Sequence, residues 1–186
     1  GSSGHLEFNT DGALCLRDLF TGTDVTTGTP LTGTALSQSN AVKAGIQELL
    51  RTGKLHGIPA ILVQGRSDAL VPVNHASRAY FGANKTAEPN SRISYYEIQN
   101  AQHFDSFLGF TGFSSHFVPL HTYFLQSMDL MFAFLKTGAA IPPSQVVRTT
   151  PRGTATISRS NVPLIPATPA STDMITFANG TVSVPN

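Results

Sequence analysis

One short apolar run limits the possible folds of this chain more than any other feature. Residues 59–64 have the length of a strand, and the three consecutive aliphatic residues at 61–63 predict that both faces of it are covered. Strands of this kind belong to parallel sheets that are flanked by helices. Gly65 ends the run and allows a sharp turn, so Asp68 is expected at the carboxyl end of the strand, where catalytic groups collect in α/β sheets.

The segment after Asp68 predicts a return to the same edge of the sheet. Pro72 is expected to open a helix that ends at Gly82, residues 91–98 form the next strand, and His103 follows directly after it. A helix followed by a parallel strand brings both strand ends to one rim. Asp68 and His103 therefore have the order and the setting of the acid and the base of a catalytic triad, in which the serine comes first.

Two more helices and one aromatic segment complete this part of the chain. Apolar residues at helical spacing predict a helix from Ser37 or Ser39 to Arg51, packed on the sheet, and a final covering helix over residues 119–138. Residues 104–117 hold five phenylalanines and two glycines, which is typical of a loop. This loop could line an acyl pocket beside His103 or serve core and lid packing, and we favour packing.

The fold class that follows is α/β: the C-terminal portion of an α/β-hydrolase, with a parallel sheet and helices on both faces. We divide the chain into a loop-rich lead-in (1–36), in which one helical turn precedes an irregular loop, the hydrolase core (37–140), and a Pro-rich extended tail (141–186). Residues 174–184 of the tail read as a hairpin with an Asn179–Gly180 turn. A lone hairpin is only marginally stable, so we expect it to dock on the core or on the rest of the enzyme.

Other candidate residues have weaker patterns. Asp105 competes with Asp68 as the acid, but its place two residues after His103 would require a tight fold-back of the chain. A metal site built from His103, Asp105, His116 and His121 is disfavoured, because His116 and His121 are five residues apart and do not share a helix face. We therefore predict no metal and no cofactor.

The nucleophile is the missing part of the pattern. Ser3 and Ser114 lie nearest to glycines, but neither stands in Gly-x-Ser-x-Gly between a strand and a helix. We expect the serine upstream, on a segment of the polypeptide that associates tightly with this one and covers the open edge of its sheet. Gly1–Gly4 resembles a cloning remnant, and the lone Cys15 is predicted to be a small buried apolar side chain.

Charge and hydropathy exclude some partners. The net charge is +1 and charged residues make up 12% of the chain without a basic cluster, so a nucleic-acid surface is not expected. The chain has no apolar run long enough to span a membrane. The content of Thr, Ser, Gly and Pro leaves the compartment open, with a slight preference for a secreted or periplasmic location over the cytoplasm.

The segments that carry this pattern resemble a known family. Residues 11–16, 55–57, 64–75 and 100–105 are similar to the C-terminal region of the bacterial 3-hydroxybutyrate oligomer hydrolases, and the resemblance covers nearly the whole chain. It implies an ester hydrolase that cleaves dimers and short oligomers released from poly(3-hydroxybutyrate). Asp68 and His103 match the acid and base of that family, and its serine lies earlier in the protein.

Two alternatives stay open. Tannases and feruloyl esterases have a similar late Asp and His, but commonly carry Cys directly after the His, where this chain has Phe104. The missing serine also allows a non-catalytic domain that keeps the hydrolase scaffold for binding or assembly.

Overall fold

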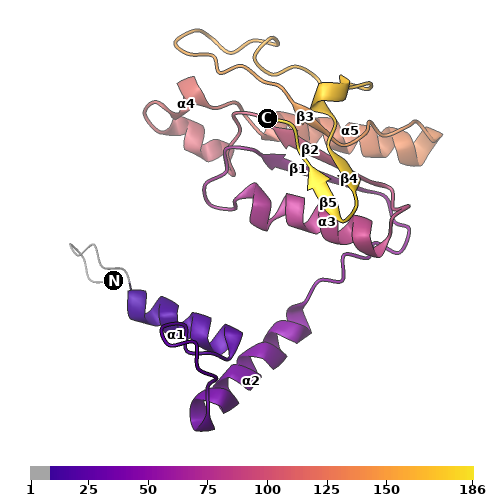
Figure 1. The fold of residues 1–186 in the computed structure, drawn as a ribbon. Helices are drawn as coiled ribbons and strands as arrows, with labels where there is room; N and C mark the ends of the chain where they lie inside the picture. Colours follow the sequence, from indigo (N-terminus) through magenta and orange to yellow (C-terminus); the bar gives the residue numbers. More distant parts are fainter. Residues whose placement is uncertain (1–8) are drawn as a thin grey trace. The chain divides into compact units, whose positions relative to one another are not determined.

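The computed structural model describes residues 9–186, which form two units divided between Arg51 and Thr52. The first unit contains α1 (Thr10–Thr21) and α2 (Gly33–Leu49). The second contains β1 (Ala60–Gly65), η1 (Val73–His75), α3 (Ser77–Ala87), β2 (Ile93–Ile98), η2 (Asp105–Gly109), α4 (Phe113–His116), α5 (His121–Thr137), β3 (Gln145–Val147), η3 (Ser171–Asp173), β4 (Thr176–Ala178) and β5 (Thr181–Ser183) (Figure 1).

The two helices of the first unit pack on each other. The Ser39 hydroxyl donates to the Leu19 carbonyl at 2.7 Å and ties α2 to α1. The lead-in was predicted to hold one helical turn before an irregular loop; the loop is present, but the turn is a full helix, α1, that ends at Gly22 in the left-handed conformation. Cys15 of this helix was predicted to be buried and is exposed. The second helix begins four residues before the predicted Ser37, directly after Thr32.

A three-stranded parallel sheet organises the second unit. Its order is β1-β2-β3, with Ala60 opposite Ile93 and Tyr96 opposite Gln145. The first two strands match the predicted runs, whereas β3 lies inside the segment predicted to be an extended tail. All three residues of β3 are buried, so this short strand is a core element despite the prolines around it.

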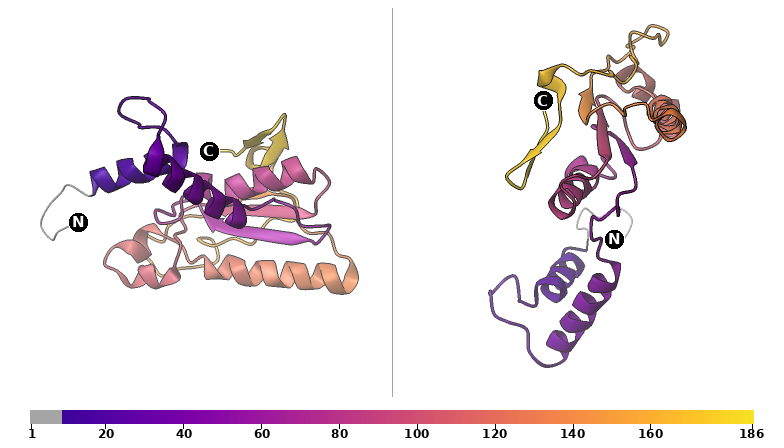
Figure 2. Two further views of the ribbon diagram at one scale, coloured as in Figure 1. Left: turned by 90° about the horizontal axis from the view of Figure 1, so that it is seen from below. Right: turned by 90° about the vertical axis from the view of Figure 1, so that its right-hand side faces the viewer.

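The alternation of side chains along the strands builds two separate cores. Ile61, Val63, Tyr96 and Ile98 belong to the cluster that includes Tyr123 of α5. The opposite face places Leu62, Tyr95 and Val146 in the cluster that includes Phe81 of α3. Helices α3 and α5 therefore cover opposite faces of the sheet (Figure 2).

Strand β1 lies at an edge of the described sheet. Both of its faces were predicted to be covered, but residues 61–63 are half-buried, and within residues 9–186 the strand pairs only with β2. The strand that this apolar run predicted is therefore present, and in this part of the chain it has one neighbouring strand.

The tail folds back on α3. The predicted hairpin is confirmed as β4 and β5, and Asn179 and Gly180 both have positive φ in its turn. Helix α3 was predicted to end at Gly82, but it continues to Ala87, and Gly82 lies where Val182 of the hairpin meets the helix. A Cβ at Gly82 would lie 3.0 Å from that side chain.

The coarse fold prediction is confirmed: the chain is a mixed α/β protein with a parallel sheet, helices and a small antiparallel hairpin. The final helix was expected over residues 119–138 and is present as α5, which Gly138 ends in the left-handed conformation. In the part of the chain that is described, every helix is too short or too polar to cross a bilayer.

Candidate functional site

Asp68 lies in the loop that leaves the carboxyl end of β1. Its side chain is only 1% exposed. One carboxylate oxygen, Oδ1, accepts hydrogen bonds from the backbone N–H groups of Leu70 at 3.0 Å and Val71 at 2.9 Å. The other oxygen is left for a partner outside the loop, so the backbone fixes the direction in which the carboxylate can act.

His103 is that partner. It follows β2 after a turn in which Asn100 takes a positive φ, and its Nδ1 lies 2.9 Å from Asp68 Oδ2. The imidazole is 34% exposed. A carboxylate can only accept, so the bond places a proton on Nδ1 and leaves Nε2 with a free lone pair. Within residues 9–186 no atom is hydrogen-bonded to Nε2, so this nitrogen is free to act as a base.

Gly65 allows the two loops to come this close. A Cβ at this position would lie 2.6 Å from the carbonyl carbon of Ala101 and still closer to its oxygen. The Ser67 N–H donates to the same carbonyl at 3.1 Å. The sharp turn expected after Gly65 is present at residues 66–67, where the Asp68 N–H donates to the Gly65 carbonyl at 3.3 Å. Gly65 also lets the backbone before His103 pass next to β1.

The Gln64 side chain holds the Asp68 loop through two hydrogen bonds, a role that the sequence pattern did not indicate. Its side-chain amide donates to the Val71 carbonyl at 2.5 Å and its oxygen accepts from the Ser77 N–H at 3.1 Å. A buried amide at the end of an apolar strand was the available signal, since such groups need hydrogen-bond partners.

A buried ion-pair network joins the two strands beneath the site. Glu97 of β2 is fully buried and accepts from Arg66 Nε, from Arg78 Nε at 2.8 Å and from the Tyr95 hydroxyl at 2.7 Å. Burial alone would raise the pKa of Glu97, but these hydrogen bonds outweigh it and hold the pKa below its ordinary value. Arg66 also donates to the Pro185 carbonyl at 2.7 Å, so the C-terminal residues take part in the network.

The competing acid has a structural role instead. Asp105 accepts the backbone N–H groups of Leu120 at 2.7 Å and His121 at 2.9 Å at the start of α5. It caps that helix, and both of its oxygens are engaged. Its carboxylate is therefore not the one that faces His103.

The structure does not assemble the other candidates. Within residues 9–186 no group of three or more His, Cys, Asp or Glu side chains is placed to hold a metal ion. The His116 ring bonds to the Gly112 carbonyl at 2.7 Å, and the Ser114 hydroxyl accepts from Arg152 at 2.7 Å. Ser3 and Gly1–Gly4 lie outside the described residues.

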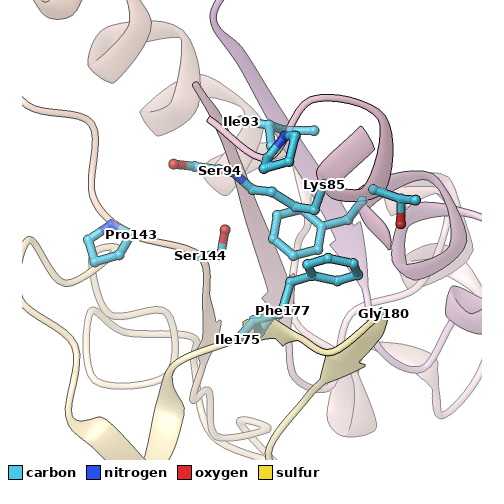
Figure 3. Close-up of a pocket in the computed structure, with 11 residues that line it drawn as sticks. Lys85, Ile93, Ser94, Pro143, Ser144, Ile175, Phe177 and Gly180 are labelled. Atoms are coloured by element: carbon cyan, nitrogen blue, oxygen red, sulfur yellow. The ribbon is translucent and has the colours of Figure 1, made fainter. Parts of the chain in front are cut away.

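One hollow of the second unit lies away from Asp68 and His103. It measures about 590 Å³ and lies between α3, the hairpin and the strands, with Lys85, Ser94, Ser144 and Phe177 among its lining residues (Figure 3). The Ser94 hydroxyl donates to the Pro142 carbonyl and that of Ser144 accepts from a backbone N–H. Lys85 donates to a backbone carbonyl, and burial lowers its pKa. Its polar groups are thus engaged, and we place the candidate site at the other end of the strands.

Comparison with known proteins identifies the family. A family model described as 3HB-oligomer hydrolase (3HBOH) matches residues 1–186. Proteins named D-(-)-3-hydroxybutyrate oligomer hydrolase are similar to this chain: that of Polaromonas sp. is 53% identical over 96% of the chain and 24% of the relative, and that of Albidiferax ferrireducens has the same three values. The protein of that name from Cupriavidus pinatubonensis is 46% identical over 100% of the chain and 26% of the relative.

The chain thus spans about a quarter of the length of these relatives. No solved structure matches it. The resemblance seen in residues 64–75 and 100–105 is confirmed by a match that extends over the whole sequence. The chain belongs to the 3HB-oligomer hydrolase family.

Proposed function

We propose that this chain supplies the acid and the base of a serine ester hydrolase that cleaves 3-hydroxybutyrate dimers and oligomers. The observation that carries the proposal is the 2.9 Å bond between Asp68 and His103 Nδ1, which leaves Nε2 open. Asp68 holds the imidazole in one tautomer and stabilises the imidazolium that forms during the reaction.

The mechanism follows from these positions. His103 Nε2 takes the proton of a serine hydroxyl as its oxygen bonds to the ester carbonyl carbon. When the ester C–O bond breaks, the same proton passes to the leaving hydroxybutyrate alkoxide, and a 3-hydroxybutyryl-serine ester is left. Water then gives a proton to Nε2 and attacks this ester, and the proton returns to the serine oxygen as the acid is released. No step of this sequence uses a cofactor.

The open edge of β1 supports a serine contributed by the remainder of the enzyme. Parallel sheets are covered at their edges and faces, yet β1 lacks a second neighbour among the described residues. A groove of about 400 Å³ lies beside it, lined by Ile61, Val63, Phe124 and Met128 among others. A further parallel strand added here would end at the same rim as Asp68 and His103, which is where the serine is needed.

The test uses Asp68→Asn and His103→Ala in the full-length enzyme. We expect kcat on a 3-hydroxybutyrate dimer to fall by about 10⁴-fold in Asp68→Asn and by about 10⁶-fold in His103→Ala, because the remaining enzyme keeps only binding and oxyanion stabilisation. His75→Ala is the matched control, since His75 is exposed and makes no side-chain bond within residues 9–186. Labelling by a fluorophosphonate should also be lost in His103→Ala, and full turnover in either variant would refute the assignment.

A non-catalytic role is the second candidate. It is favoured by the missing nucleophile: within residues 9–186 no serine hydroxyl is hydrogen-bonded to His103, whose ring contacts Asp68. If the full-length protein takes up no active-serine reagent and cleaves no ester, the scaffold serves binding or assembly.

A further inference from the structure

An aromatic surface begins at His103 and continues along the next loop. We define the Phe ladder as Phe104, Phe107, Phe110, Phe113 and Phe117. The Phe104 ring meets the imidazole of His103 edge-on, with 4.2 Å between the ring centroids. Phe107 lies 5.7 Å from Phe104 and is stacked on Phe110 at 5.7 Å. The ladder is therefore in direct contact with the base of the proposed triad.

The ladder has a covered side and an open side. Phe107, Phe113 and Phe117 are half-buried and form its base. Phe104 is 53% exposed and Phe110 is 59% exposed. Exposed rings grouped in this way are unfavourable in water, and contiguous apolar patches mark binding sites. The sequence favoured packing as the role of this loop, and packing accounts only for the half-buried rings.

Hydrogen bonds from several segments hold the ladder in place. Asp105 lies between Phe104 and Phe107 and is bound to the first turn of α5. Arg152 donates to the Ser114 carbonyl at 2.8 Å, and the Gly153 N–H donates to the Ser115 carbonyl at 3.1 Å. The open rings thus project from a braced loop, which reduces the entropy lost when a ligand binds.

We propose that Phe104 and Phe110 form the apolar wall of the acyl subsite, which receives the methyl-bearing part of a 3-hydroxybutyryl ester beside His103. This inference rests on the proposed function. A 3-hydroxybutyryl unit carries a methyl and a methylene group and no charge within the chain, so these groups can pack against the aromatic rings. The ester carbonyl is then held within reach of the base, and the wall acts in binding rather than in proton transfer.

The test compares two esters in the full-length enzyme. Phe104→Ala and Phe110→Ala should each raise KM for a 3-hydroxybutyrate dimer about 10-fold, with kcat changed less than about twofold, because each loses contact with one small apolar group. Hydrolysis of 4-nitrophenyl acetate, whose acyl part ends at one methyl group, should change less than about twofold. Phe104→Leu should keep most of the affinity for the dimer and also covers the case in which Phe104→Ala does not fold.

The matched control is Phe132→Ala, which removes a 63% exposed ring of α5 outside the ladder and should leave both esters unaffected. Equal losses on the two esters would overturn the wall, since they would mean that the rings support the fold or meet another part of the enzyme. Unchanged KM in both ladder variants would overturn it as well. In either case His103→Ala would still be inactive if the proposed triad is right, so failure of the wall can be distinguished from failure of the triad. A wild-type enzyme that does not hydrolyse the dimer would overturn both proposals.

Discussion

Replacing Gly65 by Ala tests whether the closeness of the two loops sets the geometry of the site. The added Cβ would lie 2.6 Å from the Ala101 carbonyl carbon and 2.9 Å from the Gln102 oxygen, whereas ordinary contacts begin near 3.4 Å. The atoms in the way belong to the backbone, so a side-chain rotation cannot relieve the clash. The strand or the segment that leads into His103 must move by about 1 Å.

A movement of this size is larger than the hydrogen bond tolerates. The bond between Asp68 and His103 is 2.9 Å long, and N–H···O bonds are useful only up to about 3.2 Å. We expect kcat of the full-length enzyme on a soluble ester to fall about 100-fold. Overpacking should also lower the free energy of unfolding by about 1–3 kcal/mol, measured by urea titration and by activity assays well below the unfolding temperature.

Gly45→Ala is the matched control for this change. Gly45 lies inside α2 with nothing within 4 Å of its added Cβ. The same substitution should there leave kcat unchanged and raise the free energy of unfolding by about 0.5–1 kcal/mol. Wild-type turnover and stability in Gly65→Ala would show that the close approach does not hold the pair together.

Two further substitutions test the supports of the site. Glu97→Gln leaves Arg66 and Arg78 without their carboxylate and should cost about 2–3 kcal/mol at pH 7, less than for a fully buried pair because both guanidinium groups are partly exposed. The folded pKa of Glu97 is lowered, so its stabilisation is present above the unfolded pKa of about 4.3 and is lost as pH falls through the folded pKa. The gap between wild type and variant in urea unfolding should therefore shrink at pH 3, and a constant gap would contradict the ion pairing. Asp105→Ala should cost about 1 kcal/mol and speed hydrogen exchange at the first amides of α5, with partial rescue by Asn; unchanged exchange would exclude the capping role.

The sequence was sufficient to place Asp68 and His103 because both depend on local patterns. Each follows a strand-length run, and parallel strands bring their ends to one rim. The structure agrees with that placement: the two side chains are hydrogen-bonded, and the backbone that leads to His103 passes next to Gly65.

Features that depend on distant partners were not predictable in this way. Strand β3 has only three residues, too few to show a period, and it becomes a strand because β2 lies next to it. Glu97 lies in the strand predicted over residues 91–98, but that pattern did not indicate its burial beside Arg66 and Arg78, which are 31 and 19 residues away. No local sequence pattern indicates either pairing, because the partners come together only when the chain has folded.

The bond between Arg66 and the Pro185 carbonyl joins positions 119 residues apart, and it has a practical consequence for protein engineering. A label or an inserted segment next to Pro185 would displace the carbonyl that holds the arginine two residues before Asp68. Positions for labels or insertions should therefore be chosen away from both Arg66 and Pro185.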